Sequence, residues 1–164
     1  TAPEEAKAAY RRGVTLQRLG DVPRAIEQYR VACEAGDPRG CLSAADNVRA
    51  GTTVPQDFAA AIRLYDRACE GNLGAGCSGA GYMAFKGLGQ SADASKALKH
   101  YEDGCALGDQ SGCAGAGNIL ITGAMGARRD RAAGANLLRG ACEADYDWAC
   151  DRLRDLGQTL KLGQ

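Results

Sequence analysis

Bulky aromatic side chains are scarce in this chain of 164 residues, where phenylalanine, tryptophan and tyrosine together make up 5%. Hydrophobic residues reach 45%, but alanine supplies much of that share, and 23 residues are glycine. Small side chains bury little area each, and burial stabilises a fold by about 25 cal/mol per Å². The core must therefore be built from close approach of backbones, and the composition predicts an additional stabilising element such as a covalent cross-link.

Net charge is also absent, since lysine plus arginine and aspartate plus glutamate each number 20. A main partner made of nucleic acid is excluded, because phosphate binding requires a strongly positive face. We interpret the local cluster Arg128, Arg129 and Arg131 as a solvated loop and helix start. No apolar run approaches the roughly 18 residues of a membrane span. We therefore expect no nucleic-acid partner and no membrane-spanning segment. We also expect a monomer.

Catalytic signals are missing as well. His100 is the only histidine, and the matching positions at the repeat spacing described below hold Gln28, Leu64 and Leu137. A position that accepts these side chains makes loose demands. The chain has no His-Glu-x-x-His motif and no Cys-x-x-Cys motif. We predict no catalytic residue, no metal site and no cofactor.

Eight cysteines stand out against this background, because they form four copies of the spacing Cys-x7-Cys. The first cysteines of successive copies lie 36, 36 and 37 residues apart. A self-similar period of this length indicates one supersecondary unit stacked along an axis. Four residues before the first cysteine come Tyr29, Tyr65, Tyr101 and Leu138, a stripe that we interpret as core between the two helices of each repeat.

Each repeat is predicted to contain two helices. The stretch 56–70 has apolar residues at helical spacing, such as Phe58, Ile62 and Tyr65. The helix that begins around the second cysteine of each pair ends near a glycine suited to a left-handed turn. These glycines are Gly51, Gly87 and Gly123, and the aspartates expected to cap the other helix are Asp57, Asp93 and Asp130. No strand pattern is present, and the predicted fold class is all-α.

Two sequence signatures resemble known repeat families. The spacing of small and apolar residues from Ala9 to Ala32 is similar to a tetratricopeptide repeat. The segment Ala-Cys-Glu-x-Gly-Asp-x-x-Gly-Cys at 32–41 and Val-Pro-Gln-Asp at 54–57 resemble Sel1-like repeats. The disulfide-bearing form of that family, as in the Helicobacter cysteine-rich proteins, has this cysteine spacing. The resemblance covers nearly the whole chain and weakens after Gly123, where one residue is inserted.

The resemblance implies a right-handed α/α solenoid in one repeat domain, 1–164. Its first helix pair is tetratricopeptide-like and covers 1–36. Sel1-like repeats follow at 37–72, 73–108 and 109–145, and a C-terminal capping helix and tail occupy 146–164.

The cysteines are expected to pair within each Cys-x7-Cys copy. The first lies in the last turn of one helix and the second in the opening of the next, so a short connection brings them together. The predicted disulfides are Cys33–Cys41, Cys69–Cys77, Cys105–Cys113 and Cys142–Cys150. Each is worth roughly 2.5 kcal/mol on the chain-entropy model. Four disulfides imply a periplasmic or secreted protein, and the competing interpretation is a set of reduced structural thiols in the cytosol. Zinc is disfavoured, because structural zinc sites use cysteines two to four residues apart.

Solenoids hold proteins or peptides on a concave surface. By analogy with tetratricopeptide repeats, outward positions of the first helix of each repeat supply that surface. The residues at these positions are Tyr10, Val14, Gln17, Leu42, Asp46, Arg49, Tyr82, Phe85, Lys86, Asn118 and Ile121. Matching positions differ sharply between repeats, as expected if they carry specificity, while the alternative is that Tyr82 or Phe85 only packs against a neighbouring repeat.

The predicted function is a non-catalytic scaffold or adaptor of the cell envelope that binds a protein or peptide. Two alternatives remain open. One is β-lactam or peptidoglycan-fragment binding or hydrolysis, which the Helicobacter relatives suggest, although no serine has a lysine three residues later as in Ser-x-x-Lys. The other is a structural segment of a larger envelope protein.

Overall fold

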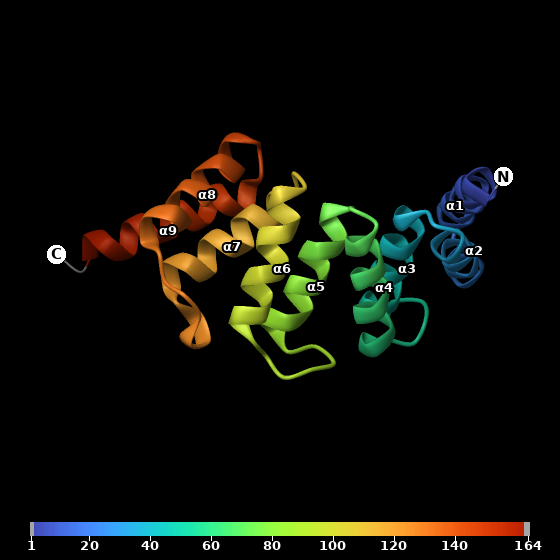
Figure 1. Ribbon diagram of the computed structural model, residues 1–164, viewed down its shortest axis with the longest axis horizontal. Helices are drawn as coiled ribbons and strands as arrows, with labels where there is room; N and C mark the ends of the chain where they lie inside the picture. The colour runs from blue at the N-terminus through green and yellow to red at the C-terminus, as the bar shows by residue number, and fades with distance from the viewer. Residues whose placement is uncertain (1, 163–164) are drawn as a thin grey trace. The chain divides into compact units, whose positions relative to one another are not determined.

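The computed structural model describes residues 2–162, and within them the chain is helical with no strand (Figure 1). Helix pairs follow one another along the sequence, joined by turns or longer loops. Their bounds are α1 Ala2–Arg18, α2 Val22–Glu34, α3 Pro38–Ala50, α4 Phe58–Glu70, α5 Gly74–Lys86, α6 Ala94–Ala106, α7 Gln110–Thr122, the 3-10 turn η1 Ala124–Gly126, α8 Arg131–Glu143 and α9 Asp147–Leu162. The expected helix at 56–70 begins at Phe58, because Asp57 is its cap.

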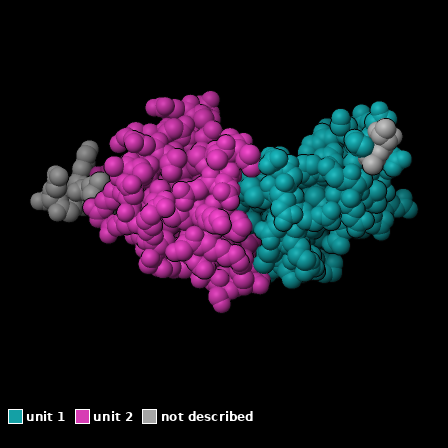
Figure 2. Space-filling view, in the orientation of Figure 1, with its two compact units in different colours: residues 1–80 teal, residues 81–164 magenta. Residues whose placement is uncertain are grey.

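Two compact units divide the chain, residues 1–80 and 81–164 (Figure 2). In unit 1, α1 packs on α2, α2 on α3, and α3 on α4. In unit 2, α6 packs on α7, α7 on α8, and α8 on α9. Each predicted repeat segment from 37 to 145 holds one helix pair, α3–α4, α5–α6 or α7–α8.

The turn between the two cysteines of a Cys-x7-Cys copy is the same in all four copies. Its last residue donates its N–H to the carbonyl of the residue before the first cysteine, as in Asp37 to Ala32 at 2.9 Å and Tyr146 to Ala141 at 3.0 Å. Its middle residue has a left-handed backbone, φ 102° at Gly36 and φ 65° at Asp145. Glycine, asparagine and aspartate tolerate that conformation best. The turn chemistry explains why the spacing Cys-x7-Cys is constant.

All four predicted disulfides form. The Cα–Cα distances are 4.7 Å for Cys33–Cys41, 4.5 Å for Cys69–Cys77, 4.5 Å for Cys105–Cys113 and 4.8 Å for Cys142–Cys150. These lie within the usual range for a disulfide. Each bond ties the last turn of one helix to the first turn of the next, as the sequence predicts.

The predicted helix ends are also confirmed. Asp57, Asp93 and Asp130 accept hydrogen bonds from the N–H groups of Ala60, Lys96 and Ala133, each at 3.0 Å. Gly51 and Gly123 end α3 and α7 with φ values of 63° and 61°. Capping aspartates and left-handed glycines therefore set the helix lengths in both units.

Buried tyrosines lie against glycines in the core. Tyr29, Tyr65 and Tyr101 are 3%, 2% and 8% exposed. A Cβ atom at Gly115 would lie 2.8 Å from the Tyr101 ring, and one at Gly81 would lie 2.9 Å from it. The ring can pack directly on these helices because glycine has no side chain. The expected close approach of backbones is present between α7 and α8, where a Cβ atom at Gly117 would lie 2.8 Å from the carbonyl oxygen of Gly134.

Candidate functional site

The residues expected to bind a partner lie on the odd-numbered helices, α1, α3, α5 and α7. We call their positions the first-helix face and describe it separately for each unit. In unit 1 the exposed members are Gln17 and Asp46, while Tyr10, Val14, Leu42 and Arg49 are half-buried. Tyr10 and Val14 pack against the cluster of Ala25, Tyr29 and Ala44, and Leu42 packs near the first disulfide.

Tyr65 brings together two of the expected binding residues in unit 1. Its hydroxyl donates to Oδ1 of Asp46, and Nε of Arg49 donates to that hydroxyl at 2.8 Å. Burial, followed by the hydrogen bond with Asp46, raises the pKa of Tyr65. Asp46 and Arg49 thus satisfy a buried hydroxyl in addition to facing solvent.

Gln17 likewise accepts a hydrogen bond from a buried tyrosine hydroxyl, one repeat earlier. The Tyr29 hydroxyl donates to Oε1 of Gln17 at 2.7 Å. The Tyr29 ring also lies 5.8 Å from the ring of Tyr10, centroid to centroid. In unit 1 the first-helix face is therefore the polar cover of the tyrosine stripe.

The first-helix face of unit 2 is more apolar. Tyr82 is 39% exposed, and Lys86 is exposed with its ammonium 5.9 Å from the centre of the Phe85 ring. Phe85 is half-buried and packs against the core of Ala94, Leu98 and their neighbours. Phe85 therefore packs against the core, as the alternative interpretation expects. Tyr82, in contrast, presents a large surface to solvent.

Asn118 and Ile121 lie further along the same face, on α7. Ile121 packs against the cluster around Leu138, and Asn118 accepts a hydrogen bond at 2.6 Å from Nε of Arg152 on α9. Sequence reasoning missed Arg152. The sequence did mark this position when the four Cys-x7-Cys copies are aligned with one another. Two residues after the second cysteine, the other copies hold the small residues Ser43, Gly79 and Gly115, whereas the last copy holds arginine.

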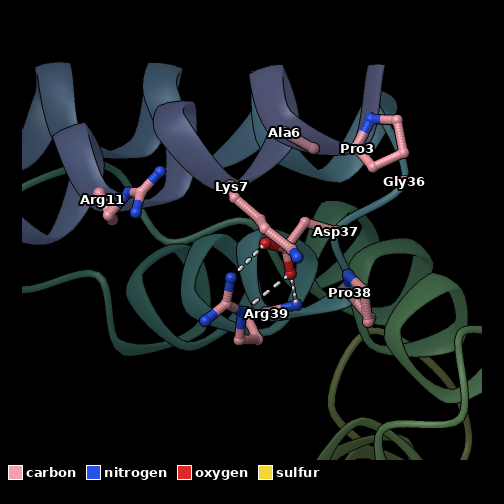
Figure 3. A pocket seen from close by; sticks show the side chains of 8 residues that line it. All are labelled: Pro3, Ala6, Lys7, Arg11, Gly36, Asp37, Pro38 and Arg39. Carbon is pink, nitrogen blue, oxygen red and sulfur yellow. Dashed lines mark hydrogen bonds and ion pairs between the residues drawn. The ribbon is translucent and has the colours of Figure 1, made fainter. Parts of the chain in front are cut away.

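A pocket in unit 1 was also missed. It has a volume of about 570 Å³ and opens between α1 and the start of α3 (Figure 3). Lys7 and Arg11 from α1 line it together with Asp37 and Arg39. Two of these residues lie on one face of α1, four positions apart, which is the weak signal that the sequence offered.

Asp37 and Arg39 form a paired group at the floor of this pocket. Nε and Nη2 of Arg39 donate to Oδ1 and Oδ2 of Asp37 at 3.0 and 2.7 Å, and Oδ1 also caps α3 by accepting the Arg39 N–H at 3.0 Å. The hydrogen bond from the Arg39 side chain is the main cause that lowers the pKa of Asp37. Asp37 is only 7% exposed, so this carboxylate is held charged and covered.

Candidates for other chemistry are few in the part of the chain that the structure describes. Residues 2–162 contain no group of three or more histidine, cysteine, aspartate or glutamate side chains placed to hold a metal ion. Within the same residues, no helix combines the length and apolar composition of a membrane span. His100 is half-buried on α6.

Comparison with solved structures identifies the fold. A Sel1 repeat protein from Oxalobacter formigenes superposes with a TM-score of 0.79 at 24% identity, covering 88% of this chain and 60% of that protein. A protective antigen present in uropathogenic Escherichia coli strains, described as displaying an SLR fold, superposes with a TM-score of 0.85 at 23% identity over 94% of this chain. The chain has the Sel1-repeat fold.

Cysteine rich protein B of Helicobacter pylori is also similar, with a TM-score of 0.54 at 25% identity, covering 69% of this chain and 96% of that protein. No protein-family model and no curated protein sequence matches the chain. The chain spans 60% of the length of the Oxalobacter protein and 34% of that of the Escherichia coli antigen. The predicted all-α Sel1-like solenoid with one disulfide per repeat is confirmed.

Proposed function

We propose that the chain is a non-catalytic scaffold that binds a protein or peptide through its first-helix face, in an oxidising compartment of the cell envelope or outside the cell. The observation that carries this proposal is the contrast between a repeated frame and a varied face. Disulfides, turns and helix caps recur with nearly identical geometry, whereas one position of the face holds Asp46, Tyr82 or Asn118.

Exposure of the varied positions supports a binding role. Asp46 and Tyr82 are both exposed, although each lies on a helix that packs its other side into the core. An aromatic side chain that is 39% exposed beside an exposed lysine provides both apolar area and charge for a partner. Side chains of such different chemistry at matching positions suit a peptide or protein ligand, whose own side chains differ from residue to residue.

The four disulfides support the compartment. All eight cysteines are paired, and none is free. Disulfides persist outside the cytosol and are rare within it, where thiols are kept reduced. The β-lactam alternative rests on the resemblance to the Helicobacter proteins and stays a prediction, as does a role as a segment of a longer protein.

The test is partner capture followed by reconstitution. Immobilised chain is incubated with a cell-envelope fraction, retained proteins are identified by mass spectrometry, and affinity for each purified protein is measured by calorimetry. The variants Tyr82→Ala and Lys86→Glu should weaken binding to a direct partner by about tenfold or more each, as expected when an interface anchor is removed. Both residues are exposed, so the fold should remain intact.

Leu107→Ala is the matched control, because Leu107 is 45% exposed in a cysteine turn and lies off the first-helix face. Its affinity should equal that of the unchanged chain. Phe85, Asp46 and Arg49 are unsuitable test positions, since each also completes the core or a buried hydroxyl. Equal retention of a partner by all these variants would show that binding does not use this face.

A further inference from the structure

The pocket of unit 1 concentrates positive charge in a chain whose net charge is zero. Three of its lining side chains are cations, Lys7, Arg11 and Arg39, and one is an anion, Asp37. Glu4 and Glu5 lie in the first turn of α1 but do not line the pocket. Since Asp37 is neutralised by its own arginine, the pocket presents two positive charges in excess.

Arg39 is held ready for a ligand. Its guanidinium is fixed on one edge by the two hydrogen bonds to Asp37 and on one face by Tyr10, whose ring centre lies 4.3 Å from Cζ. A guanidinium carries five N–H donors, and the fork to Asp37 uses two of them. The remaining donors belong to a group whose orientation is already set, which reduces the entropy lost on binding.

Lys7 and Arg11 supply the excess charge. Both are exposed, and Figure 3 shows the Lys7 side chain extending from α1 toward Asp37 and Arg39. Among the residues that the structure describes, the Arg11 side chain has no hydrogen-bond or ion-pair partner. Its charge is therefore available to a ligand that enters from solvent.

We infer that this pocket binds an acidic peptide segment of a partner protein, with its carboxylates against Lys7, Arg11 and Arg39. The inference rests on the proposed function and specifies one of its contacts. Charge complementarity favours the carboxylates, because Lys7, Arg11 and Arg39 line a pocket in which Asp37 is the one lining carboxylate among the described residues.

The apolar part of the wall favours a peptide over a small dicarboxylate. Pro3, Ala6 and Pro38 line the pocket together with the charged groups, and Ala6 is 1% exposed. A volume of about 570 Å³ lies in the range that accommodates several peptide groups. An extended segment can place side-chain carboxylates on the cations while its backbone and small side chains cover this apolar surface.

The experiment uses a fluorescein-labelled peptide of alternating glutamate and proline, and a second peptide with glutamine in place of each glutamate. Fluorescence anisotropy at low ionic strength measures the dissociation constant of each with the full chain. The glutamate peptide should bind, and the double variant Lys7→Glu/Arg11→Glu should weaken it by about tenfold or more. Added salt should weaken binding as well, since the contacts are partly exposed.

The matched control is Arg18→Glu/Arg30→Glu, which makes the same change in net charge at exposed positions outside the pocket. It should alter affinity by no more than about twofold. Amide chemical-shift changes on titration should concentrate at residues 3–11 and 36–39.

The inference is overturned if the glutamine peptide binds equally well, if neither peptide binds, if the control variant loses affinity as much, or if the shifts fall elsewhere. It is also overturned if heparin or succinate binds at the pocket while the peptide does not. The Tyr82→Ala variant separates the two proposals, because it lies in unit 2 and should leave the glutamate peptide bound. Failure of that variant to affect a captured partner would therefore weaken the proposed function alone.

Discussion

The two units differ in the hydrogen bonding of their buried tyrosine hydroxyls. In unit 1 the hydroxyls of Tyr29 and Tyr65 hydrogen-bond to polar side chains of the first-helix face. In unit 2, the Tyr101 hydroxyl has no hydrogen bond within the described residues. Burial is the main cause that raises the pKa of Tyr101, with smaller contributions from Tyr82 and Tyr146. The fourth repeat dispenses with the hydroxyl altogether, since Leu138 stands there.

This difference shows that variation along the first-helix face has two sources. Asp46 and Arg49 are polar partly because Tyr65 requires polar neighbours, whereas Phe85 and Ile121 at the matching position meet an apolar core. Residues that fail to repeat therefore do not all report on a partner. Those that remain after the tyrosine partners and core residues are removed, Tyr82 and Lys86 above all, form the more selective set.

The largest effect is expected from the disulfides. Replacing Cys33 and Cys41 by alanine should lower the free energy of unfolding by about 2.5 kcal/mol, measured by urea titration, because the loop closed by the bond regains its freedom in the unfolded chain. In the intact protein, graded dithiothreitol should open Cys142–Cys150 of unit 2 before Cys33–Cys41 of unit 1. Both cysteines of the former are half-buried, while those of the latter are each 3% exposed.

Partial reduction followed by alkylation and peptide mass spectrometry gives the order. The Cys33–Cys41 pair opening first, or all four pairs opening together, would contradict the link between burial and reduction.

A glycine beside the first disulfide provides the next comparison. Gly40→Ala should destabilise the protein by about 2 kcal/mol, because the added Cβ would lie 2.7 Å from Cβ of Ala32 and 2.9 Å from the Cys33 nitrogen. Gly140→Ala, on α8 of unit 2, has nothing within 4 Å and should stabilise by about 0.5–1 kcal/mol. Thermal unfolding followed by circular dichroism measures both, and shifts of the same sign would refute the packing argument.

The tyrosine hydroxyls test the difference between the units directly. Tyr65→Phe should cost about 1 kcal/mol, since Asp46 and Arg49 lose a shared partner. Tyr101→Phe should change stability by less than about 0.5 kcal/mol, because no described hydrogen bond is lost. Equal costs in urea unfolding would mean that the polar cover of unit 1 contributes nothing specific.

Much of the fold could be predicted because its determinants are local. The cysteine spacing, the capping aspartates and the terminal glycines each act within a few residues, and all were confirmed. The pocket could not be predicted in this way. Lys7 and Arg39 are distant in sequence and line one pocket only once α1 packs on α2 and α2 on α3, and the bond from Arg152 to Asn118 likewise joins separate helices.

The smallest effect concerns Asp37, whose pKa is lowered in the folded protein mainly by the hydrogen bond from Arg39. A carboxyl with a lowered folded pKa contributes stability above its unfolded pKa of about 3.9, and that contribution is lost as pH falls through the folded value. Asp37→Asn should therefore cost somewhat less than about 1 kcal/mol at pH 7, because asparagine still caps the helix. The free energies of unfolding of the two proteins, measured by urea titration, should converge as pH falls through the lowered pKa of Asp37. The corresponding cap in unit 2, Asp109, bonds the Ser111 hydroxyl and the Gly112 N–H, so Asp109→Asn removes no arginine fork and should cost less. A difference between Asp37→Asn and the unchanged protein that persists as pH falls through the lowered pKa of Asp37 would show that the fork with Arg39 adds nothing beyond the cap.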